Sequence, residues 1–247
     1  MNASPAEQMR LLDLQALDAQ LDRLAHRRAT LPEIAELQRI GGEQAATRDD
    51  VVVAETEAGD IRREQDKFEG DIAQVRQRIV RDQQRMDAGA VSSAKELESL
   101  QHEIDSLHRR QTALEDSEIE VMERLEVVEN RLASLVARSE HLAAASKETE
   151  ERRDAALAEI DVEVRAVQAD REGLTPTLPA DLLALYDKLR AQFGGVGAAA
   201  LRQKRCDGCR LELNATDIGR VRAAEEDEVL RCEECRRILV RTPEAGI

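Results

Sequence analysis

The chain has 247 residues, carries a net charge of −15 and is 35% charged, yet it contains two Phe, one Tyr and no Trp. A rounded core of this size normally buries many aromatic side chains, so the composition excludes an ordinary compact globule and is typical of long helices and coiled coils. The acidic balance also disfavours a general nucleic-acid binder, because phosphate contacts require lysine and arginine.

Two helix starts are visible near the N-terminus. SPAE at 4–7 combines a capping serine, a proline suited to the first turn and a glutamate that completes a capping box. An apolar stripe then runs through Leu14, Leu17, Leu21 and Leu24. TLPE at 30–33 predicts a second start with Thr30 as the cap, and Pro32 predicts a kink near 30–32.

From residue 37 onward, apolar residues recur at alternating spacings of three and four, which is the heptad pattern of a coiled coil. The predicted stripe consists of Leu37, Ile40, Gln44, Thr47, Val51, Ala54, Ala58, Ile61, Gln65, Phe68, Ile72, Val75, Ile79, Asp82 and Met86. Gly41, Gly42, Gly59 and Gly70 should weaken this helix locally.

MDAGAVSSAKELE at 86–98 interrupts the pattern and predicts a turn near 86–93, after which Ser93 and Glu96 spell another capping box. The stripe returns as Leu97, Leu100, Ile104, Leu107, Gln111, Leu114, Glu118, Val121, Leu125, Val128, Leu132, Leu135, Ser139 and Leu142, and again as Leu157, Ile160, Val164 and Val167. One stripe on each arm predicts an antiparallel hairpin over 1–178. A parallel dimer of one long helix is the alternative, which the turn residues disfavour.

The segment after the hairpin should be short and compact. Pro176 and Pro179 end the return helix. PADLLALYDKLRAQFGG over 179–195 predicts a connecting amphipathic helix. The last segment, 196–247, follows, and GVGAAALRQKR predicts a strand that leads to the first cysteine pair.

Two C-x-x-C pairs, Cys206 with Cys209 and Cys232 with Cys235, contain all four cysteines. Each tight turn offers two thiolates, and two such turns supply the tetrahedral four-sulfur shell that suits zinc. RLEL, a short helix capped by Asn214, EVLR and RILV then predict strand, helix, strand and closing strand. The predicted fold is mostly α: a long antiparallel coiled-coil hairpin with a small C-terminal β-rich zinc ribbon.

We expect one structural Zn²⁺ per chain. Buried or disulfide-linked pairs, a redox dithiol and bound iron are the alternatives at these cysteines. A catalytic zinc would need an open fourth position, and no histidine follows His141. His26, His102, His108 and His141 are interpreted as solvated helix positions, and no catalytic residues are identified.

Basic residues flank both cysteine pairs, and they are candidates for contacts with nucleic acid or a partner. They are Arg202, Lys204, Arg205, Arg210, Arg236, Arg237 and Arg241. The alternative is ordinary solubilising charge: the acidic EEDE at 225–228 lies nearby, and no aromatic residues are available to stack on bases. We expect nucleic-acid binding, where it occurs, to be weak.

The layout resembles the bacterial family with an N-terminal coiled-coil helical hairpin and a C-terminal four-cysteine zinc ribbon. KELESLQHEIDSL, LLALYDKLR, CDGC and CEECRRIL carry the resemblance. It implies a non-enzymatic adaptor or chaperone-like protein, in a family whose members are linked to transcription and secretion systems or described as nucleic-acid binders. It also implies that Cys206, Cys209, Cys232 and Cys235 are the zinc ligands. Arg236 departs from the family, which usually has glycine there.

The leading hypothesis is therefore a zinc-binding adaptor that works through protein–protein contacts of hairpin and ribbon, with an unidentified protein partner. A nucleic-acid-binding protein that uses the basic residues around the cysteines is the alternative. An RNA polymerase regulator that inserts its hairpin tip is disfavoured, because MDAGAVSS offers a single acidic residue. We expect no enzymatic activity and a monomer or weak dimer.

The sequence also bears on location. No apolar run approaches the roughly 20 residues that span a bilayer, and the N-terminus lacks the pattern of a secretory signal. We expect a cytoplasmic protein without membrane association, in a reducing environment where paired cysteines favour a metal over a disulfide.

Overall fold

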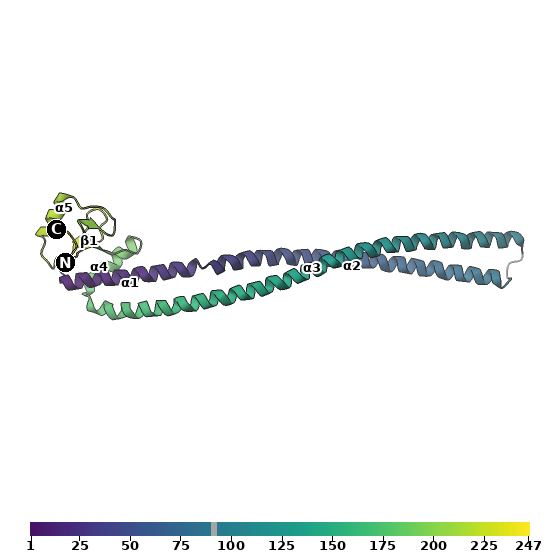
Figure 1. The fold of residues 1–247 in the computed structure, drawn as a ribbon, viewed down its shortest axis with the longest axis horizontal. Helices are drawn as coiled ribbons and strands as arrows, with labels where there is room; N and C mark the ends of the chain where they lie inside the picture. The colour runs from purple at the N-terminus through teal and green to yellow at the C-terminus, as the bar shows by residue number, and fades with distance from the viewer. Residues whose placement is uncertain (90–92) are drawn as a thin grey trace. The chain divides into compact units, whose positions relative to one another are not determined.

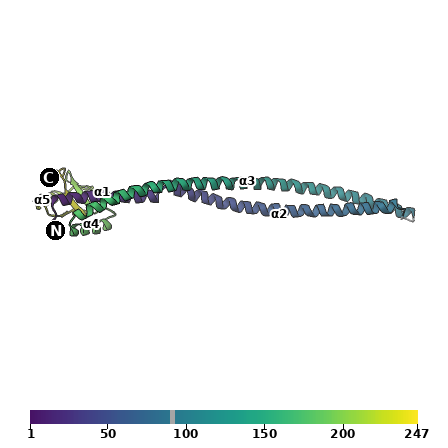
Figure 2. The same cartoon turned by 90° about the horizontal axis from the view of Figure 1, so that it is seen from below.

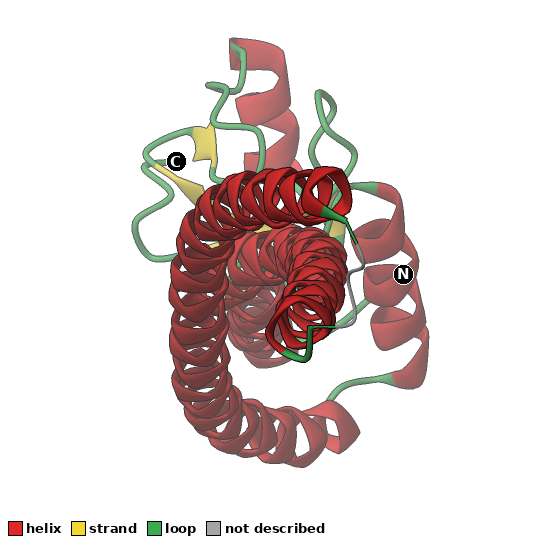
Figure 3. Cartoon of the chain, turned by 90° about the vertical axis from the view of Figure 1, so that its right-hand side faces the viewer, coloured by secondary structure: helices red, strands yellow, loops and turns green. Residues whose placement is uncertain are grey.

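The computed structural model describes residues 1–89 and 93–247, which divide into two compact units: Met1–Ile34 with Glu151–Ile247, and Ala35–Glu150. The helices are α1 (Pro5–Ala29), α2 (Pro32–Asp87), α3 (Ala94–Leu174), the short 3-10 helix η1 (Thr175–Thr177), α4 (Ala180–Gln192) and α5 (Ala215–Ala223). The strands are β1 (Ala198–Arg202), β2 (Arg205–Cys206), β3 (Leu230–Arg231) and β4 (Ile238–Arg241). Helix is the dominant structure, and the strands form a small part of the chain (Figures 1 and 3).

In the unit Ala35–Glu150, α2 and α3 run antiparallel and side by side (Figures 1 and 2). Every buried residue of α2 belongs to the predicted stripe: Ile40, Thr47, Ala54, Ala58, Ile61, Ile72, Val75, Ile79 and Asp82. On α3 the buried residues Leu100, Ile104, Val121, Val128 and Leu142 also belong to it. The prediction is wrong for Leu97, which is 45% exposed, and for the exposed Ser139, and it missed the buried Thr149. The hairpin is confirmed.

Two apolar clusters show how the arms meet. Ala58 and Ile61 pack with Val121 and Val128, and a second cluster contains Val75, Ile79, Leu100 and Ile104. Ion pairs between the arms flank these clusters: Arg62–Glu129, Arg76–Glu115 and Arg124–Glu64, each with an N–O distance of 2.6 Å. Exposed pairs of this kind add little free energy, about 0–1 kcal/mol each, so the apolar stripes supply most of the stability.

The predicted turn near 86–93 is described in part. Gly89 has a φ of 64°, in the region that favours glycine, and Ser93 Oγ accepts from the backbone N–H of Glu96 at 3.2 Å. The rest of that prediction, residues 90–92, lies outside the described residues.

The other unit begins with the predicted capping box. The Glu7 N–H donates to Ser4 Oγ at 3.3 Å, and the Ser4 N–H donates to Glu7 Oε2 at 2.7 Å. The prediction of Thr30 as an N-cap is wrong. Thr30 ends α1 by donating its N–H to the carbonyl of His26, and α2 begins two residues later with Pro32 in its first turn.

The small sheet has the order β2-β1-β4-β3, with β1 and β4 parallel and both outer pairs antiparallel. Its two faces belong to different apolar clusters. Ile238 and Val240 pack with Leu11, Leu14, Leu182, Tyr186 and Leu189 of the helices, whereas Leu239 packs with Leu201, Val221, Cys206 and Cys232. The alternation along β4 therefore joins helices and ribbon in one unit.

One predicted strand is absent among the described residues. RLEL makes an isolated bridge from Glu212 to Arg205 and no ladder. The backbone of this segment instead bonds to residues at β2. The Leu211 carbonyl accepts from the Cys206 N–H at 3.0 Å, and the Leu213 N–H donates to the Lys204 carbonyl at 2.8 Å. The predicted helix after Asn214 is present, and Asn214 Oδ1 accepts from the Asp217 N–H at 2.8 Å.

The first residues of the chain bind the ribbon. The Ala3 N–H donates to the carbonyl of Asp227 at 2.7 Å, and the Val229 N–H donates to Met1 at 3.1 Å. Buried Gln8 extends this contact, because its Nε2 donates to the carbonyls of Ala3 at 2.9 Å and of Glu226 in the ribbon at 3.3 Å. Within residues 1–89 and 93–247, no helix has a stretch that is long and apolar enough to cross a membrane.

Candidate metal centre and its surroundings

The four cysteines of the two C-x-x-C pairs converge on one point. Their sulfur atoms all lie within 4.8 Å of one another, with Sγ–Sγ distances of 3.8 Å for Cys206–Cys235 and 4.0 Å for Cys209–Cys232. A tetrahedral zinc with Zn–S bonds of about 2.3 Å places its sulfurs about 3.8 Å apart. The donor set therefore fits a structural zinc with four thiolate ligands.

Matching backbone turns hold the two pairs. The Arg210 N–H donates to the Cys206 carbonyl at 2.7 Å, and the Arg236 N–H donates to the Cys232 carbonyl at 2.8 Å. Arg210 and Arg236 adopt φ values of 61° and 62°, the left-handed region that glycine enters most easily. Arginine at 236 thus takes the same conformation as its counterpart at 210, so the departure from glycine leaves the second turn equivalent to the first.

Burial shifts the pKa of the thiols in this centre. It raises the pKa of Cys206, although the backbone N–H of Cys209 donates to that sulfur, and it also raises the pKa of Cys232. Burial acts in the same direction on Cys235, but hydrogen bonds from the backbone and side chain of Arg237 leave the pKa of this thiol lowered overall. A bound divalent cation would offset the charge of four thiolates held this close, and would thereby contribute to folding.

The predicted solvated histidines lie apart from this centre in the chain. His26 belongs to α1, while His102, His108 and His141 belong to α3, and all four are exposed. Within the described ranges, the four cysteines form the one group of three or more residues that could hold a metal ion.

Two of the predicted contact residues serve the fold. Arg237 donates to the carbonyls of Phe193 at 2.8 Å and Val196 at 3.0 Å, and its guanidinium lies 5.4 Å from the centre of the Phe193 ring. Arg241 donates to the carbonyl of Ala224, just after α5, at 3.0 Å. Both guanidinium groups therefore satisfy backbone oxygens that the end of a helix leaves without a helical partner.

Two more of these residues are paired with carboxylates. Arg202 Nε lies 3.4 Å from both Asp207 and Glu244, and Arg236 Nη1 lies 3.3 Å from Glu233. All of these side chains are exposed enough for salt to screen the pairs.

The remaining three, Lys204, Arg205 and Arg210, are exposed and make no side-chain hydrogen bond or ion pair within the part of the chain that the structure describes. Lys204 lies in the tight turn between β1 and β2, where Gln203 and Lys204 have φ values of 46° and 67°. Among the seven candidates, those without an internal partner thus lie around the first cysteine pair.

The comparisons with known proteins agree with this architecture. Residues 14–194 match the CT398-like coiled coil hairpin domain, and residues 205–239 match the C4-type zinc ribbon domain. The chain belongs to the family of CT398-like coiled-coil hairpin proteins. The resemblance seen in the sequence is thereby confirmed.

Relatives of this family extend over nearly the whole chain. The uncharacterized protein Rv2229c of Mycobacterium tuberculosis is 40% identical over 241 residues, 98% of both chains, and ML1638 of Mycobacterium leprae is 30% identical over 90% of this chain and 94% of its own. A solved structure from Mycobacterium smegmatis has a TM-score of 0.86 at 36% identity, covering 98% of this chain and all of that one. CT398 from Chlamydia trachomatis has a TM-score of 0.71 at 22% identity, covering 96% and 98%, and shows the shared fold.

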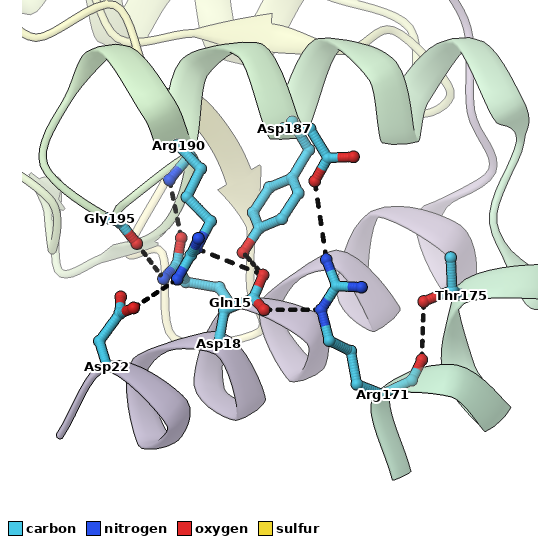
Figure 4. A network of polar contacts seen from close by, with 10 residues as sticks. Gln15, Asp18, Asp22, Arg171, Thr175, Asp187, Arg190 and Gly195 are labelled. Carbon is cyan, nitrogen blue, oxygen red and sulfur yellow. Dashed lines mark hydrogen bonds and ion pairs between the residues drawn. The ribbon is translucent and has the colours of Figure 1, made fainter. Parts of the chain in front are cut away.

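A buried polar network, shown in Figure 4, is the feature of this unit that the sequence did not reveal. Asp18 of α1 accepts from Arg171 Nε of α3 and from the Tyr186 hydroxyl of α4, both at 2.7 Å, and Arg190 Nε lies 3.4 Å away. The Asp18 side chain is 3% exposed. Burial, followed by the hydrogen bond to Asp18, raises the pKa of Tyr186 well above its ordinary value.

The same network reaches the strand that leads to the metal centre. Gln15 Oε1 accepts from the Gly197 N–H at 2.7 Å, while Gln15 Nε2 donates to the Gly195 carbonyl at 2.9 Å. A Cβ at Gly197 would lie 2.6 Å from the carbonyl oxygen of Tyr186, so this close approach requires glycine. The available sequence signal was the spacing of Asp18, which continues the buried line of Leu11 and Leu14.

Proposed function

We propose that this protein is a non-enzymatic adaptor of chaperone-like type, which binds another protein through its hairpin and its zinc ribbon. The proposal rests on how the basic residues around the metal centre are used. Four of the seven candidates are engaged within the chain, Arg237 and Arg241 by carbonyls and Arg202 and Arg236 by carboxylates. The positive surface that a nucleic-acid backbone would require is correspondingly reduced.

The chemistry of the centre supports the same proposal. A zinc with four thiolate ligands has no open position for substrate or water, so it acts on folding. Such a centre also adds about two negative charges to a chain whose net charge is already −15. These charges disfavour a phosphate backbone and leave a protein surface as the favoured partner.

Nucleic-acid binding remains the second candidate because of one observation. Lys204, Arg205 and Arg210 are exposed and lack an internal partner among the described residues, and they surround a single cysteine turn. Three phosphate contacts would give weak binding that falls steeply with salt.

The test is affinity capture of the full chain from its native cell, with and without nuclease. A protein partner that survives nuclease at 200 mM salt, and that Lys204→Ala, Arg205→Ala and Arg210→Ala leave in place, supports the adaptor. Loss of all captured material on nuclease treatment contradicts it.

A control variant with the same change of charge makes the assignment specific. Arg48→Ala, Arg85→Ala and Arg109→Ala remove three exposed arginines of the hairpin helices. Nucleic-acid binding that these substitutions preserve, and that the substitutions at the first cysteine turn abolish, would favour the second candidate.

A further inference from the structure

The unit Ala35–Glu150 has valines where a coiled coil normally places polar residues. Val52 and Val53 of α2 are 55% and 57% exposed, and Val127 of α3 is 69% exposed. None of the three belongs to the stripe that joins the arms. Valine is also a poorer helix former than the Lys, Glu or Gln usual at such positions, so neither helix stability nor packing of the hairpin explains these residues.

These valines line a groove between the arms. A hollow of about 780 Å³ is lined by Val52, Val53 and Val127, with Ile61 and Val128 among its other apolar residues. A second hollow of about 490 Å³ shares lining residues with the first and extends along the same arms to Phe68. The stretch of α2 from residue 52 to residue 68 is about 24 Å long, the length of roughly four helical turns.

Carboxylates predominate along the rim of this groove, and two of them, Glu120 and Glu123, are unpaired among the described residues. The charged lining residues are Glu57, Asp60, Glu64, Glu120, Glu123 and one base, Arg124. Three of these carboxylates are paired with arginines: Glu57 with Arg131 at 3.3 Å, Asp60 with Arg63, and Glu64 with Arg124 at 2.6 Å. Glu120 and Glu123 are exposed and have no ion-pair partner among residues 1–89 and 93–247, so their charge faces solvent along the groove.

Apolar floor and acidic rim together select one kind of occupant. We propose that this groove, between residues 52–68 of α2 and 117–128 of α3, binds a cationic amphipathic helix of a partner protein, with its apolar stripe on the valines and its lysines or arginines beside the acidic rim. A second copy of the chain would bring the same acidic rim against itself, which like charges disfavour. An anionic partner meets the same repulsion. Helix-in-groove binding of this type uses anchors at i, i+3, i+4 and i+7.

This inference rests on the proposed adaptor function, for which it specifies the surface and the chemistry of the partner. The probe is a synthetic 18-residue helical peptide with leucines at i, i+3, i+4 and i+7 and lysines on the flanks, with binding to the full chain measured by fluorescence anisotropy at 150 mM salt. One control peptide has the same composition in scrambled order, and another has glutamates in place of the lysines. We expect the stripe peptide to bind at least about tenfold more tightly than either control.

Variants then locate the binding site. Val53→Gln with Val127→Gln should weaken binding by about tenfold, because two apolar side chains no longer cover the peptide. Val80→Gln with Val136→Gln changes two other exposed valines of the same arms and should leave binding unchanged. All four substitutions replace exposed residues by a better helix former, so the hairpin should keep its fold.

The charge of the rim is tested in the same way. Glu120→Lys with Glu123→Lys should weaken binding by about tenfold at 150 mM salt and by more at lower salt, where screening is reduced. The control variant Glu98→Lys with Glu140→Lys makes the same change of net charge elsewhere on the arms. It should change the affinity for the peptide by less than threefold.

Several results would overturn the proposal. These are absence of peptide binding, equal binding of the scrambled peptide, and tighter binding of the acidic peptide. Loss of peptide affinity in the control variants as large as in the groove variants would also overturn it. A dimer in sedimentation velocity that Val53→Gln with Val127→Gln dissociates would assign the groove to a second copy instead. If native capture of a protein survives the groove substitutions, the adaptor function stands and the groove assignment falls.

Discussion

The buried carboxylate of Asp18 should be the most sensitive polar position in the unit that holds the zinc ribbon. Removing one partner of a fully buried ion pair costs about 3–5 kcal/mol. Here Arg171 and Arg190 keep 31% and 27% of their side chains exposed, so water can partly solvate them after the change. We therefore expect Asp18→Asn to lower the free energy of unfolding of this unit by about 2–3 kcal/mol.

The chain provides a local probe for this measurement. Tyr186 is the one tyrosine and there is no tryptophan, so intrinsic fluorescence during urea unfolding reports on the network itself. Asp22→Asn is the matched control, because Asp22 makes a 2.7 Å contact with the same Arg190 but is 52% exposed. Its loss should cost less than about 1 kcal/mol, as for other surface pairs.

Coupling between the partners distinguishes a network from a set of separate contacts. Tyr186→Phe removes the hydroxyl donor to Asp18 and should cost about 2 kcal/mol, measured by hydrogen exchange of α4 because the fluorophore is lost. The double variant with Asp18→Asn should cost about 1 kcal/mol or more less than the sum of the two. If Asp18→Asn is no worse than Asp22→Asn, or if the two losses simply add, Asp18 does not organise this site.

Four further predictions follow from single residues. Burial and Asp18 raise the pKa of Tyr186 above its ordinary 10.0, so the unfolded chain releases this proton first. The free energy of unfolding should therefore be unchanged below about pH 10 and fall above it. Tyrosinate absorbance at about 295 nm should appear together with loss of helical circular dichroism. Tyrosinate in folded protein at about pH 10 would contradict this. Zinc chelation, or Cys232→Ser, should expose the amides of α5 and β3 to hydrogen exchange while the middle of α2 stays protected; full protection without metal would contradict the zinc assignment. Gly70→Ala should stabilise α2 by about 0.5–1 kcal/mol because its Cβ meets open space, whereas Gly197→Ala should destabilise by about 1–3 kcal/mol because its Cβ would meet Tyr186; thermal melts with the same sign for both would refute the geometry. Arg236→Gly should retain zinc and stabilise slightly, by up to about 1 kcal/mol, because glycine adopts φ 62° without strain; a loss of zinc on titration would show that the arginine holds the turn.

The hairpin was predictable because its determinants are local and periodic. A stripe at spacings of three and four identified every buried residue of α2, including the polar Thr47 and Asp82. The cysteine pairs were predictable because a C-x-x-C turn determines its own geometry, and the caps at Ser4 and Asn214 because a side chain reaches a backbone group three residues away.

The remaining features depend on contacts distant in sequence. Asp18 and Tyr186 are 168 residues apart, and no local pattern links a carboxylate on one helix to a phenol on another. Arg237 and Arg241 appeared in the sequence as free charges beside a zinc turn. Their actual partners are carbonyls at the ends of α4 and α5, whose positions follow from tertiary structure.

The strand β4 explains why the ribbon should work as one body with the helix ends that surround it. It begins three residues after Cys235, so zinc at the second cysteine turn also positions this strand. Because successive side chains of a strand point to opposite faces, Leu239 packs with the cysteines while Ile238 and Val240 pack with α1 and α4. Order at the metal is thereby transmitted to a core that contains no metal ligand. Binding of the proposed partner to the ribbon would therefore be coupled to α1 and α4 through this packed strand.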